Sequence, residues 1–479
     1  MSGAVTSFFK RGWQSVKEEV QSTFENIRDT KFNIAFLFAV LCIFFVIVGN
    51  VIILIAYNFW IAQFPSDSTG LNTKQIAIQV VTMLFLVFPF ALLCVAFTIV
   101  YSPRPLWRVL TDRNRVRGPW YRFFLIFASG ATNSISSIIA LYAMTHTPEF
   151  IQAVLLCCIP FSAQAWTVIF IPIERERDYL SLTFIVSILL FVAGILLSSF
   201  SAFLHPNTNG EKALWAWALL YLVSTIIFGL WCVAQRLYLD SVVLTAPLDA
   251  RGAAIAHNSE VDTSATPLEH NDSVTGATFS GEDPSIRHTN DGGDKLLLSS
   301  SEELLARRQW GKQNVDDNAA KMVLLVVGLF FQLLISFAAF PVDATPFLGS
   351  STSAPHAWEG FRNSINFIFS SWLHVRYGLL VTLGFAMSFV GCTYLNEQSP
   401  TLASVVLQLA GPITSLVIII IPQWNVFQDS ISVGEKVGGV ILLLLATLLY
   451  NLWDQQSLRV LRAKAKKATY QSEPTVPAL

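Results

Sequence analysis

Neutral polar side chains inside long apolar runs are the residues of this chain that could contact a solute. They are Asn50, Asn133, Ser136, Ser137, Gln152, Gln332, Ser388, Gln408 and Thr414. The interiors of the same runs hold no Asp or Glu, although ionisable residues are the usual markers of ion or substrate paths in a bilayer. The pattern therefore predicts a pathway lined by hydrogen-bonding groups. The alternative interpretation is that these groups join neighbouring helices, at about 0.6 kcal/mol for each hydrogen bond.

A repeated stretch places two prolines at the same spacing in both halves of the chain. YAMTHTPEFIQAVLLCCIP, at residues 142–160, returns 252 residues later as YLNEQSPTLASVVLQLAGP. Pro148 and Pro400 stand where a helix would begin, a position that tolerates proline. Pro160 and Pro412 follow 12 residues later, where proline bends a helix. Because paired interruptions of apolar segments point to a transport site, we predict that these prolines form mirrored gating elements, with packing alone as the alternative.

Two carboxylates, Glu149 and Glu397, lie beside the repeated prolines at the mouths of their apolar runs. They are candidates for coupling transport to protons or for gating, and ordinary exposed loop carboxylates are the alternative interpretation.

Sequence patterns of known enzymes do not occur in this chain. There is no phosphate-binding loop, zinc-protease helix, hydrolase elbow or dinucleotide glycine pattern. The six cysteines all fall in apolar runs, where small core residues are expected rather than disulfides or metal ligands. We therefore expect no enzyme activity, no catalytic residue, no cofactor and no metal site.

The apolar runs themselves indicate a membrane protein. The chain has 53% hydrophobic and only 13% charged residues, which is far too apolar for a soluble protein of this length. A helix needs about 20 residues to cross the bilayer core, and we expect ten runs to do so. They are Asn33–Tyr57, Gln75–Tyr101, Tyr121–Met144, Phe150–Ile173, Leu180–Leu204, Ala213–Gln235, Met322–Phe340, Tyr377–Leu395, Thr401–Pro422 and Val437–Leu452.

Basic residues in the loops predict the orientation, since Lys and Arg in short loops stay in the cytoplasm. Arginines crowd the loops after the second and fourth runs, and the tail after Leu452 holds five basic residues from Arg459 to Lys467. Both termini are therefore expected in the cytoplasm. Because five spans separate the repeated stretches, the fold class we predict is an all-α polytopic membrane protein, with ten transmembrane helices in two inverted five-helix repeats.

The segments between and around the runs complete the predicted organisation. Apolar positions three to five residues apart between Ser7 and Arg28 favour a helix lying on the membrane surface. The insert before the seventh run is rich in Ser, Thr, Asn, Asp and Gly, which is typical of disorder. The predicted parts are 1–32, a cytoplasmic amphipathic helix; 33–237, the first half with span six; 238–319, a disordered cytoplasmic insert; 320–453, spans seven to ten, with a lumenal loop of short helices at 341–376; and 454–479, a basic cytoplasmic tail.

In its motifs and their order the chain resembles the chloroquine-resistance-transporter-like family of the drug/metabolite transporter superfamily. The residues that carry the resemblance are THTPEFIQAVLLCCIP at 145–160, FFQLLISFAAFPVDATPFLG at 330–349 and VVLQLAGPITS at 405–415. The resemblance implies export of amino acids, short peptides or cationic solutes from a vacuole or lysosome, driven by protons. Two departures bear on this. Asn133 and Ser388 stand where family members carry acidic residues, and the lumenal loop lacks the cysteines of the best-known members.

We therefore predict a secondary-active solute carrier of a vacuolar or lysosomal membrane, working by alternating access. Its expected partners are a small-molecule substrate and membrane lipid. Whether protons drive the transport is left open. The net charge of −1 gives no indication of nucleic-acid binding. One alternative is a nucleotide-sugar or sugar-phosphate exchanger, which would need paired Lys or Arg in its cavity. The other is a receptor or scaffold whose insert binds cytosolic sorting or regulatory proteins.

Overall fold

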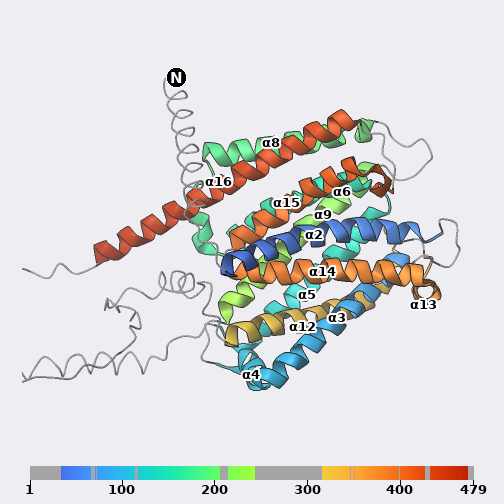
Figure 1. The fold of residues 1–479 in the computed structure, drawn as a ribbon, viewed down its shortest axis with the longest axis horizontal. Coiled ribbons are helices and arrows are strands. Elements are labelled where there is room, and N and C mark those ends of the chain that lie inside the picture. Colours follow the sequence, from blue (N-terminus) through green and yellow to red (C-terminus); the bar gives the residue numbers. More distant parts are fainter. Residues whose placement is uncertain are drawn as a thin grey trace, which may run out of the picture.

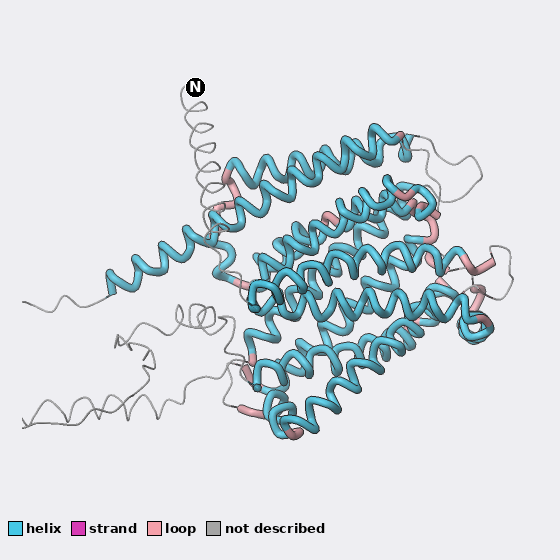
Figure 2. Tube along the Cα trace, in the orientation of Figure 1, coloured by secondary structure: helices cyan, strands magenta, loops and turns pink. Residues whose placement is uncertain are grey.

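The computed structural model describes a bundle of long helices. It covers residues 34–65, 71, 73–113, 117–204, 214–242, 315–345, 347–349, 351–398, 400–426 and 432–472. Every element within these residues is a helix, and the long helices lie side by side (Figure 1, Figure 2). The amphipathic helix expected at 1–32 and nearly all of the expected insert lie outside the described residues.

Nine helices in the described part of the chain are long and apolar enough to cross a membrane. They are α2 (Ile34–Ala62), α3 (Lys74–Tyr101), α5 (Pro119–Met144), the joined pair α6 (Glu149–Leu156) and α7 (Ile159–Phe170), α8 (Leu182–Leu204), α9 (Leu214–Ser241), α12 (Val315–Ala338), α14 (Trp372–Gln398) and α16 (Val433–Ser472). The tenth expected span corresponds to α15 (Pro400–Ile420), whose apolar stretch Leu409–Ile420 is shorter. The chain is thus an all-α, multi-pass membrane protein.

Several helices continue beyond the apolar runs that predicted them. α16 ends at Ser472 rather than Leu452, and α12 begins at Val315 rather than Met322. Hydropathy marks where a helix leaves the bilayer, whereas the helix itself continues as long as its residues favour it and no Gly or Pro intervenes. Much of the predicted basic tail is therefore helical, and the last residues of the predicted insert belong to α12.

The two ends of the bundle carry different short helices (Figure 1). One end, which we call the α4 end, carries α4 (Arg104–Thr111) and η1 (Pro172–Glu176). At the other, here the α13 end, lie η3 (Phe340–Ala344), α13 (Ala354–Ser370) and η4 (Pro422–Trp424). The expected short helices between residues 341 and 376 are present as η3 and α13.

Facing glycines let α2 and α14 approach closely. A Cβ atom added at Gly49 would lie 2.6 Å from the Gly384 carbonyl oxygen, and one at Gly384 would lie 2.8 Å from the Gly49 carbonyl oxygen. Small residues are the usual means by which membrane helices bring their backbones into contact. α8 and α16 meet in the same way, since a Cβ at Gly439 would overlap Ser198 and lie 3.1 Å from the Gly194 carbonyl oxygen.

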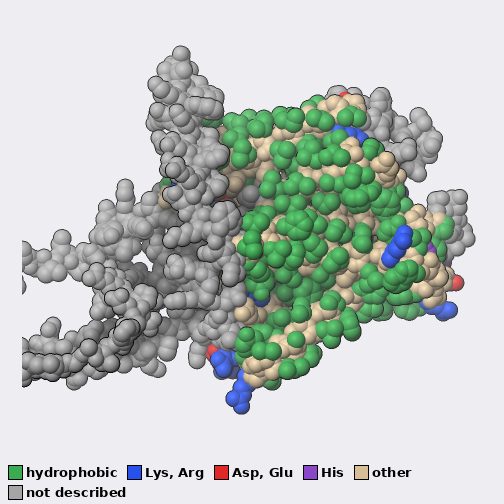
Figure 3. Space-filling view, viewed as in Figure 1, with side chains coloured by type: hydrophobic (Ala, Val, Ile, Leu, Met, Phe, Trp, Pro, Cys, Tyr) green, Lys and Arg blue, Asp and Glu red, His purple; other side chains and the backbone are tan. Residues whose placement is uncertain are grey.

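The sides of the bundle expose large apolar side chains, among them Phe88 and Leu189. Figure 3 shows apolar side chains over most of the visible face, with lysine and arginine mainly toward its ends. In water such a surface would drive aggregation, whereas in a bilayer it faces lipid. The outer surface therefore agrees with the membrane location, and the polar groups of interest lie between helices.

Candidate functional site

The predicted pathway residues lie mainly between helices, where six of them form hydrogen bonds to a neighbouring helix. These six are Asn50, Asn133, Ser136, Gln152, Gln332 and Ser388. They form separate contacts at α2–α14, α5–α12, α5–α9 and α2–α6 rather than one connected network. Of the rest, Thr414 bonds to the Ala410 carbonyl oxygen of its own helix at 2.7 Å, and Ser137 is half-buried. Gln408 belongs to α15, and its side chain lies outside the described residues.

Gln152 forms a buried amide pair with Asn58, a residue that sequence analysis missed. The Asn58 amide nitrogen donates to Gln152 Oε1 at 3.0 Å, and Gln152 Nε2 donates to Asn58 Oδ1 at 3.2 Å. Gln152 Nε2 also donates to the Thr147 carbonyl oxygen. The expected first span ended at Tyr57, one residue too early to include Asn58. The apolar residues after it, from Phe59 to Ala62, were the available signal that the helix continues.

Asn133 and Gln332 form a second buried pair, between α5 and α12. Asn133 Nδ2 donates to Gln332 Oε1 at 2.9 Å, and one turn along the helices Ser134 and Ser336 share a hydrogen bond of 2.9 Å. Asn133 Oδ1 and Gln332 Nε2 are buried and have no hydrogen-bond partner among the described residues. One acceptor and one donor are therefore free at the same place. Such a pair can bind a small group that both donates and accepts hydrogen bonds.

The four repeated prolines take the positions expected of them, with one difference between the halves. Pro148 precedes α6, and Pro400 is the first residue of α15. Pro160 is the second residue of α7, directly after a break in the helix at Cys157–Cys158, whereas Pro412 lies inside an uninterrupted α15. Proline removes one helical hydrogen bond in both cases. Only in the first half is the helix interrupted, so that it forms two separate helices, α6 and α7.

Glu149 is buried rather than exposed, so its interpretation as a solvated loop carboxylate is wrong. It is the first residue of α6, is 0% exposed, and accepts a hydrogen bond of 2.8 Å from the Val426 backbone nitrogen. A carboxylate at a helix N-terminus interacts favourably with the helix dipole. Glu149 thereby connects α6 to the segment after η4. Glu397, its suggested partner in the other half, lies in α14, and its side chain is outside the described residues.

Asp343 is a second buried carboxylate at the α13 end, and sequence analysis missed it. Its carboxylate accepts hydrogen bonds from Tyr142 at 3.0 Å, from Thr73 at 3.2 Å and from Ser351. Three hydroxyl donors can stabilise a buried carboxylate, because each bond to an ionised acceptor is stronger than a neutral one. Asp343 therefore joins η3 to the start of α3 and the end of α5. Asp343 lies in the predicted lumenal loop at 341–376, after predicted span seven. No pattern in the sequence of that loop indicated that its side chain is buried.

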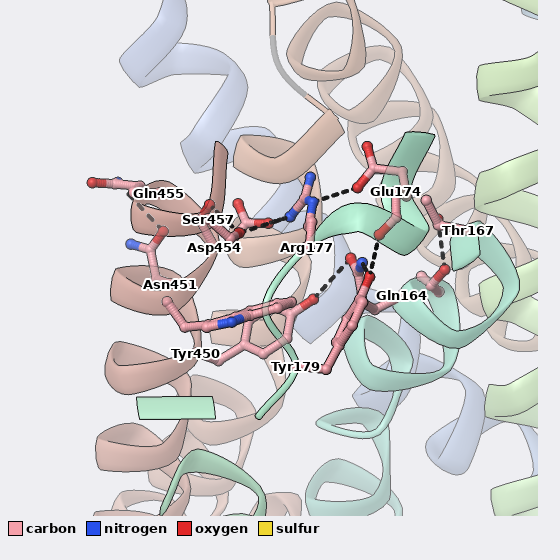
Figure 4. A network of polar contacts seen from close by, with 12 residues as sticks. Gln164, Thr167, Glu174, Arg177, Tyr179, Tyr450, Asn451, Asp454, Gln455 and Ser457 are labelled. Atoms are coloured by element: carbon pink, nitrogen blue, oxygen red, sulfur yellow. Dashed lines mark hydrogen bonds and ion pairs between the residues drawn. The ribbon is translucent and has the colours of Figure 1, made fainter. Parts of the chain in front are cut away.

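Charged residues at the α4 end form a buried network (Figure 4). The Arg177 guanidinium pairs with Glu174 in η1 and with Asp454 in α16, and Arg236 of α9 pairs with Glu174 at 3.2 Å. The side chains of Arg177 and Asp454 are each 3% exposed. Because an unpaired charge is costly to bury, the network fixes the α7–α8 connection against α9 and α16.

Aromatic and amide groups extend this network. Gln164 of α7 donates to the Tyr179 hydroxyl at 2.8 Å and accepts from the Tyr450 hydroxyl at 3.4 Å (Figure 4). Burial lowers the pKa of Arg177, but the neighbouring carboxylates of Asp454 and Glu174 outweigh burial and place it above its ordinary value. For Tyr179, whose charged form is the deprotonated one, burial raises the pKa. Arg177 therefore remains charged, and the Tyr179 hydroxyl keeps its proton.

Arg122, in the first turn of α5, is a buried cation. It is 0% exposed, and its guanidinium donates to the Leu110 carbonyl oxygen at 3.1 Å and the Asp112 carbonyl oxygen at 2.6 Å. Leu110 lies in the last turn of α4 and Asp112 is its C-cap residue, where carbonyl groups have no helical N–H partner. Arg122 therefore anchors the C-terminal end of α4 to α5.

Comparisons with models of protein families and with curated proteins found no match to this chain. The structural class that the residues define is thus a multi-pass helical membrane protein with buried, neutral polar pairs between its helices.

Proposed function

We propose that the chain is a secondary-active solute carrier whose ten spans form two inverted halves. Helix packing supports the inverted repeat. α2 packs on α14 as α9 packs on α5, and α15 packs on α2 as α7 packs on α9. The contacts α3–α12, α6–α15 and α8–α16 each join a helix to its counterpart in the other half. Pseudo-two-fold symmetry about an axis in the membrane plane would produce this arrangement.

Equivalent serines support the same symmetry. Ser136 on α5 and Ser388 on α14 are 252 residues apart, the offset of the repeated proline stretch. Ser136 donates to the Ser224 carbonyl oxygen on α9 at 2.8 Å, and Ser388 accepts from Asn50 on α2 at 3.0 Å. Each serine thus contacts the first helix of the other half. The chemistry of the two contacts differs, but their place in the two halves is the same.

The observation that carries the proposal is the Asn133–Gln332 pair with its free buried acceptor and donor. A solute held there would be polar and would need no permanent charge to bind. Amino acids and short peptides, whose amide, ammonium and carboxylate groups both donate and accept, fit these groups. In the proposed topology the arginine-rich α4 end faces the cytoplasm, and the membrane is that of a vacuole or lysosome.

The proline segments are the proposed moving parts. α15 packs against both α6 and α7, and rocking of one half against the other is the general mechanism of carriers with inverted repeats. Glu149 at the α13 end and the Arg177 network at the α4 end would hold the two mouths. Proton binding by Glu149 or Glu397 is the proposed form of coupling.

Flux in reconstituted vesicles tests the proposal. Purified protein in vesicles with an imposed pH gradient is expected to transport at least one radiolabelled amino acid or short peptide faster than protein-free vesicles. Asn133→Leu should reduce that flux. Thr132→Val, which removes a hydroxyl that bonds to the Ala128 and Ser129 carbonyl oxygens of its own helix, should leave the flux near the wild-type value. Absence of both flux and ligand-dependent stabilisation across amino acids, peptides and organic cations would disprove the assignment.

A further inference from the structure

The short helix α4 has two contrasting faces. Pro105 and Val109 are buried, with Val109 packed in a cluster with Leu125 and Ile126 of α5 and residues of α9 and α12. Arg104, Trp107, Arg108 and Thr111 are exposed. The exposed positions follow the spacing of three and four residues that places them on one stripe of a helix. α4 therefore presents two arginines and a tryptophan away from the bundle.

The position of α4 is fixed from both sides. Arg122 holds its last carbonyl groups, as described above. At its start, Ser102 has φ 70° and ψ 166°, and it is the only non-glycine residue with a positive φ in the described part of the chain. This backbone region is almost confined to glycine and costs about 1–3 kcal/mol, so it persists only where the surrounding structure enforces it. The exposed stripe is thus held rigidly rather than on a free loop.

Further basic and aromatic residues extend the stripe along the connection to α5. Arg113 and Arg117 are exposed, and the Arg117 guanidinium lies 5.4 Å from the centre of the Tyr121 ring. Trp120 is 85% exposed. The described residues between α3 and the first turn of α5 contain four arginines and one acidic residue, Asp112. Figure 3 shows arginine and lysine side chains gathered at this corner of the molecule.

We propose that this surface, formed by Arg104, Trp107, Arg108 and Arg117, binds the headgroups of anionic phospholipids in the leaflet at the α4 end. Exposed tryptophans at the end of a membrane bundle belong at the headgroup level, where their rings bridge apolar and polar surroundings. Arginines beside them reach the lipid phosphates, which accept two parallel hydrogen bonds from one guanidinium. The excess positive charge selects anionic over zwitterionic lipids. The inference rests on the membrane-spanning fold and is independent of which solute is transported.

Lipid binding by the full-length protein in detergent tests the inference. Wild-type protein should retain phosphatidylserine in native mass spectrometry and melt at a higher temperature with it than with phosphatidylcholine. The triple variant R104Q/R108Q/R117Q should bind phosphatidylserine on the order of a hundredfold more weakly, because each basic residue near an anionic surface contributes roughly a fivefold preference. R104K/R108K/R117K, which keeps the charges, should retain most of the binding.

The control is R362Q/R376Q, which removes two exposed arginines at the α13 end, of which Arg376 lies beside the Tyr377 ring. It should bind phosphatidylserine as the wild type does, and all variants should melt alike in phosphatidylcholine. Inorganic phosphate alone should give no stabilisation. Equal retention by the glutamine triple variant, an equal loss in the control, or stabilisation by inorganic phosphate to the same extent would each overturn the inference. None of these outcomes depends on transport, so a failed flux assay would leave the inference intact.

Discussion

Asn58 on α2 and Gln152 on α6 exchange two hydrogen bonds, of 3.0 and 3.2 Å, in a fully buried contact between helices. Two side-chain amides that face each other in this way satisfy one donor and one acceptor on each partner. Removing one of them leaves the other amide without its partner in an apolar surrounding, which costs about 1–3 kcal/mol. The pair is therefore a direct means of measuring how much neutral polar contacts stabilise the bundle.

Asn58→Leu and Gln152→Leu should each lower the free energy of unfolding by about 1–3 kcal/mol. The double variant should lose less than the sum of the two, since neither amide is then left unpaired. Thermal melting in detergent, analysed as a double-mutant cycle, measures the difference. Additive losses would show that the two amides do not stabilise each other.

The glycine contact between α2 and α14 gives a prediction of steric origin. Gly49→Ala places a Cβ 2.6 Å from the Gly384 carbonyl oxygen, so the helices must separate, at a cost of about 1–3 kcal/mol. Gly328 in α12 has nothing within 4 Å of its added Cβ. Gly328→Ala should therefore be neutral or stabilising by up to about 1 kcal/mol. Melting temperatures of the two variants should change in opposite directions, or at least differ clearly.

Arg177→Met should be strongly destabilising. It leaves the buried carboxylates of Glu174 and Asp454 without their shared cation, and breaking a buried ion pair in this way costs about 3–5 kcal/mol. Arg175→Met is the control, because Arg175 is exposed and, within the described part of the chain, donates only to the Val168 and Ile169 carbonyl oxygens. Its effect should be smaller by at least half. Chemical unfolding followed by circular dichroism measures both, and equal losses would contradict the importance of the network.

Ser102→Gly should stabilise the protein by about 1 kcal/mol, because glycine adopts a φ of 70° without steric cost. Ser102→Ala keeps the Cβ and should bring no gain. Thermal melting of the two variants under one condition distinguishes relief of strain from loss of the hydroxyl. If alanine stabilised as much as glycine, strain at this residue would not be the cause.

Tyr142→Phe should loosen the α13 end. The variant keeps the ring but removes one of three hydroxyl donors to Asp343, a loss of about 1.5–3 kcal/mol for a bond to a charged group. Hydrogen exchange should increase in η3 and at the start of α13 and stay unchanged in η1 at the opposite end. A uniform increase at both ends would indicate general destabilisation instead.

The helices were predictable because apolar runs of bilayer length have a clear signature, and nine of the expected spans have counterparts long and apolar enough to cross a membrane. Their ends were less predictable. α16 continues to Ser472, since a helix leaving the bilayer keeps its backbone hydrogen bonds in water. The break at Cys157–Cys158 was indicated by Pro160, but the same residue type at position 412 produced no break. Tertiary packing decides whether a proline breaks its helix, and the spacing of residues in the sequence does not show that packing.

The buried charges were the largest omission. Glu174, Arg177 and Asp343 all lie near span ends, where a sequence indicates contact with water. Their burial depends on partners far along the chain, such as Asp454 for Arg177 and Tyr142 for Asp343. Hydropathy averages over neighbours in the sequence, so it does not detect contacts between residues that are far apart in the chain. Six of the neutral polar residues in the apolar runs are buried, namely Asn133, Ser136, Gln152, Gln332, Ser388 and Thr414, whereas Asn50 and Ser137 are half-buried.

The break between α6 and α7 has a consequence for the direction of movement. Two short helices can change their mutual angle at a pair of residues, whereas uninterrupted α15 must tilt as one piece. In a carrier built from these halves, the two open states would not be mirror images, and the activation barriers for exposing the site to one side and to the other would differ. Rectification, a faster return in one direction than in the other, would then originate in the backbone rather than in any charged side chain.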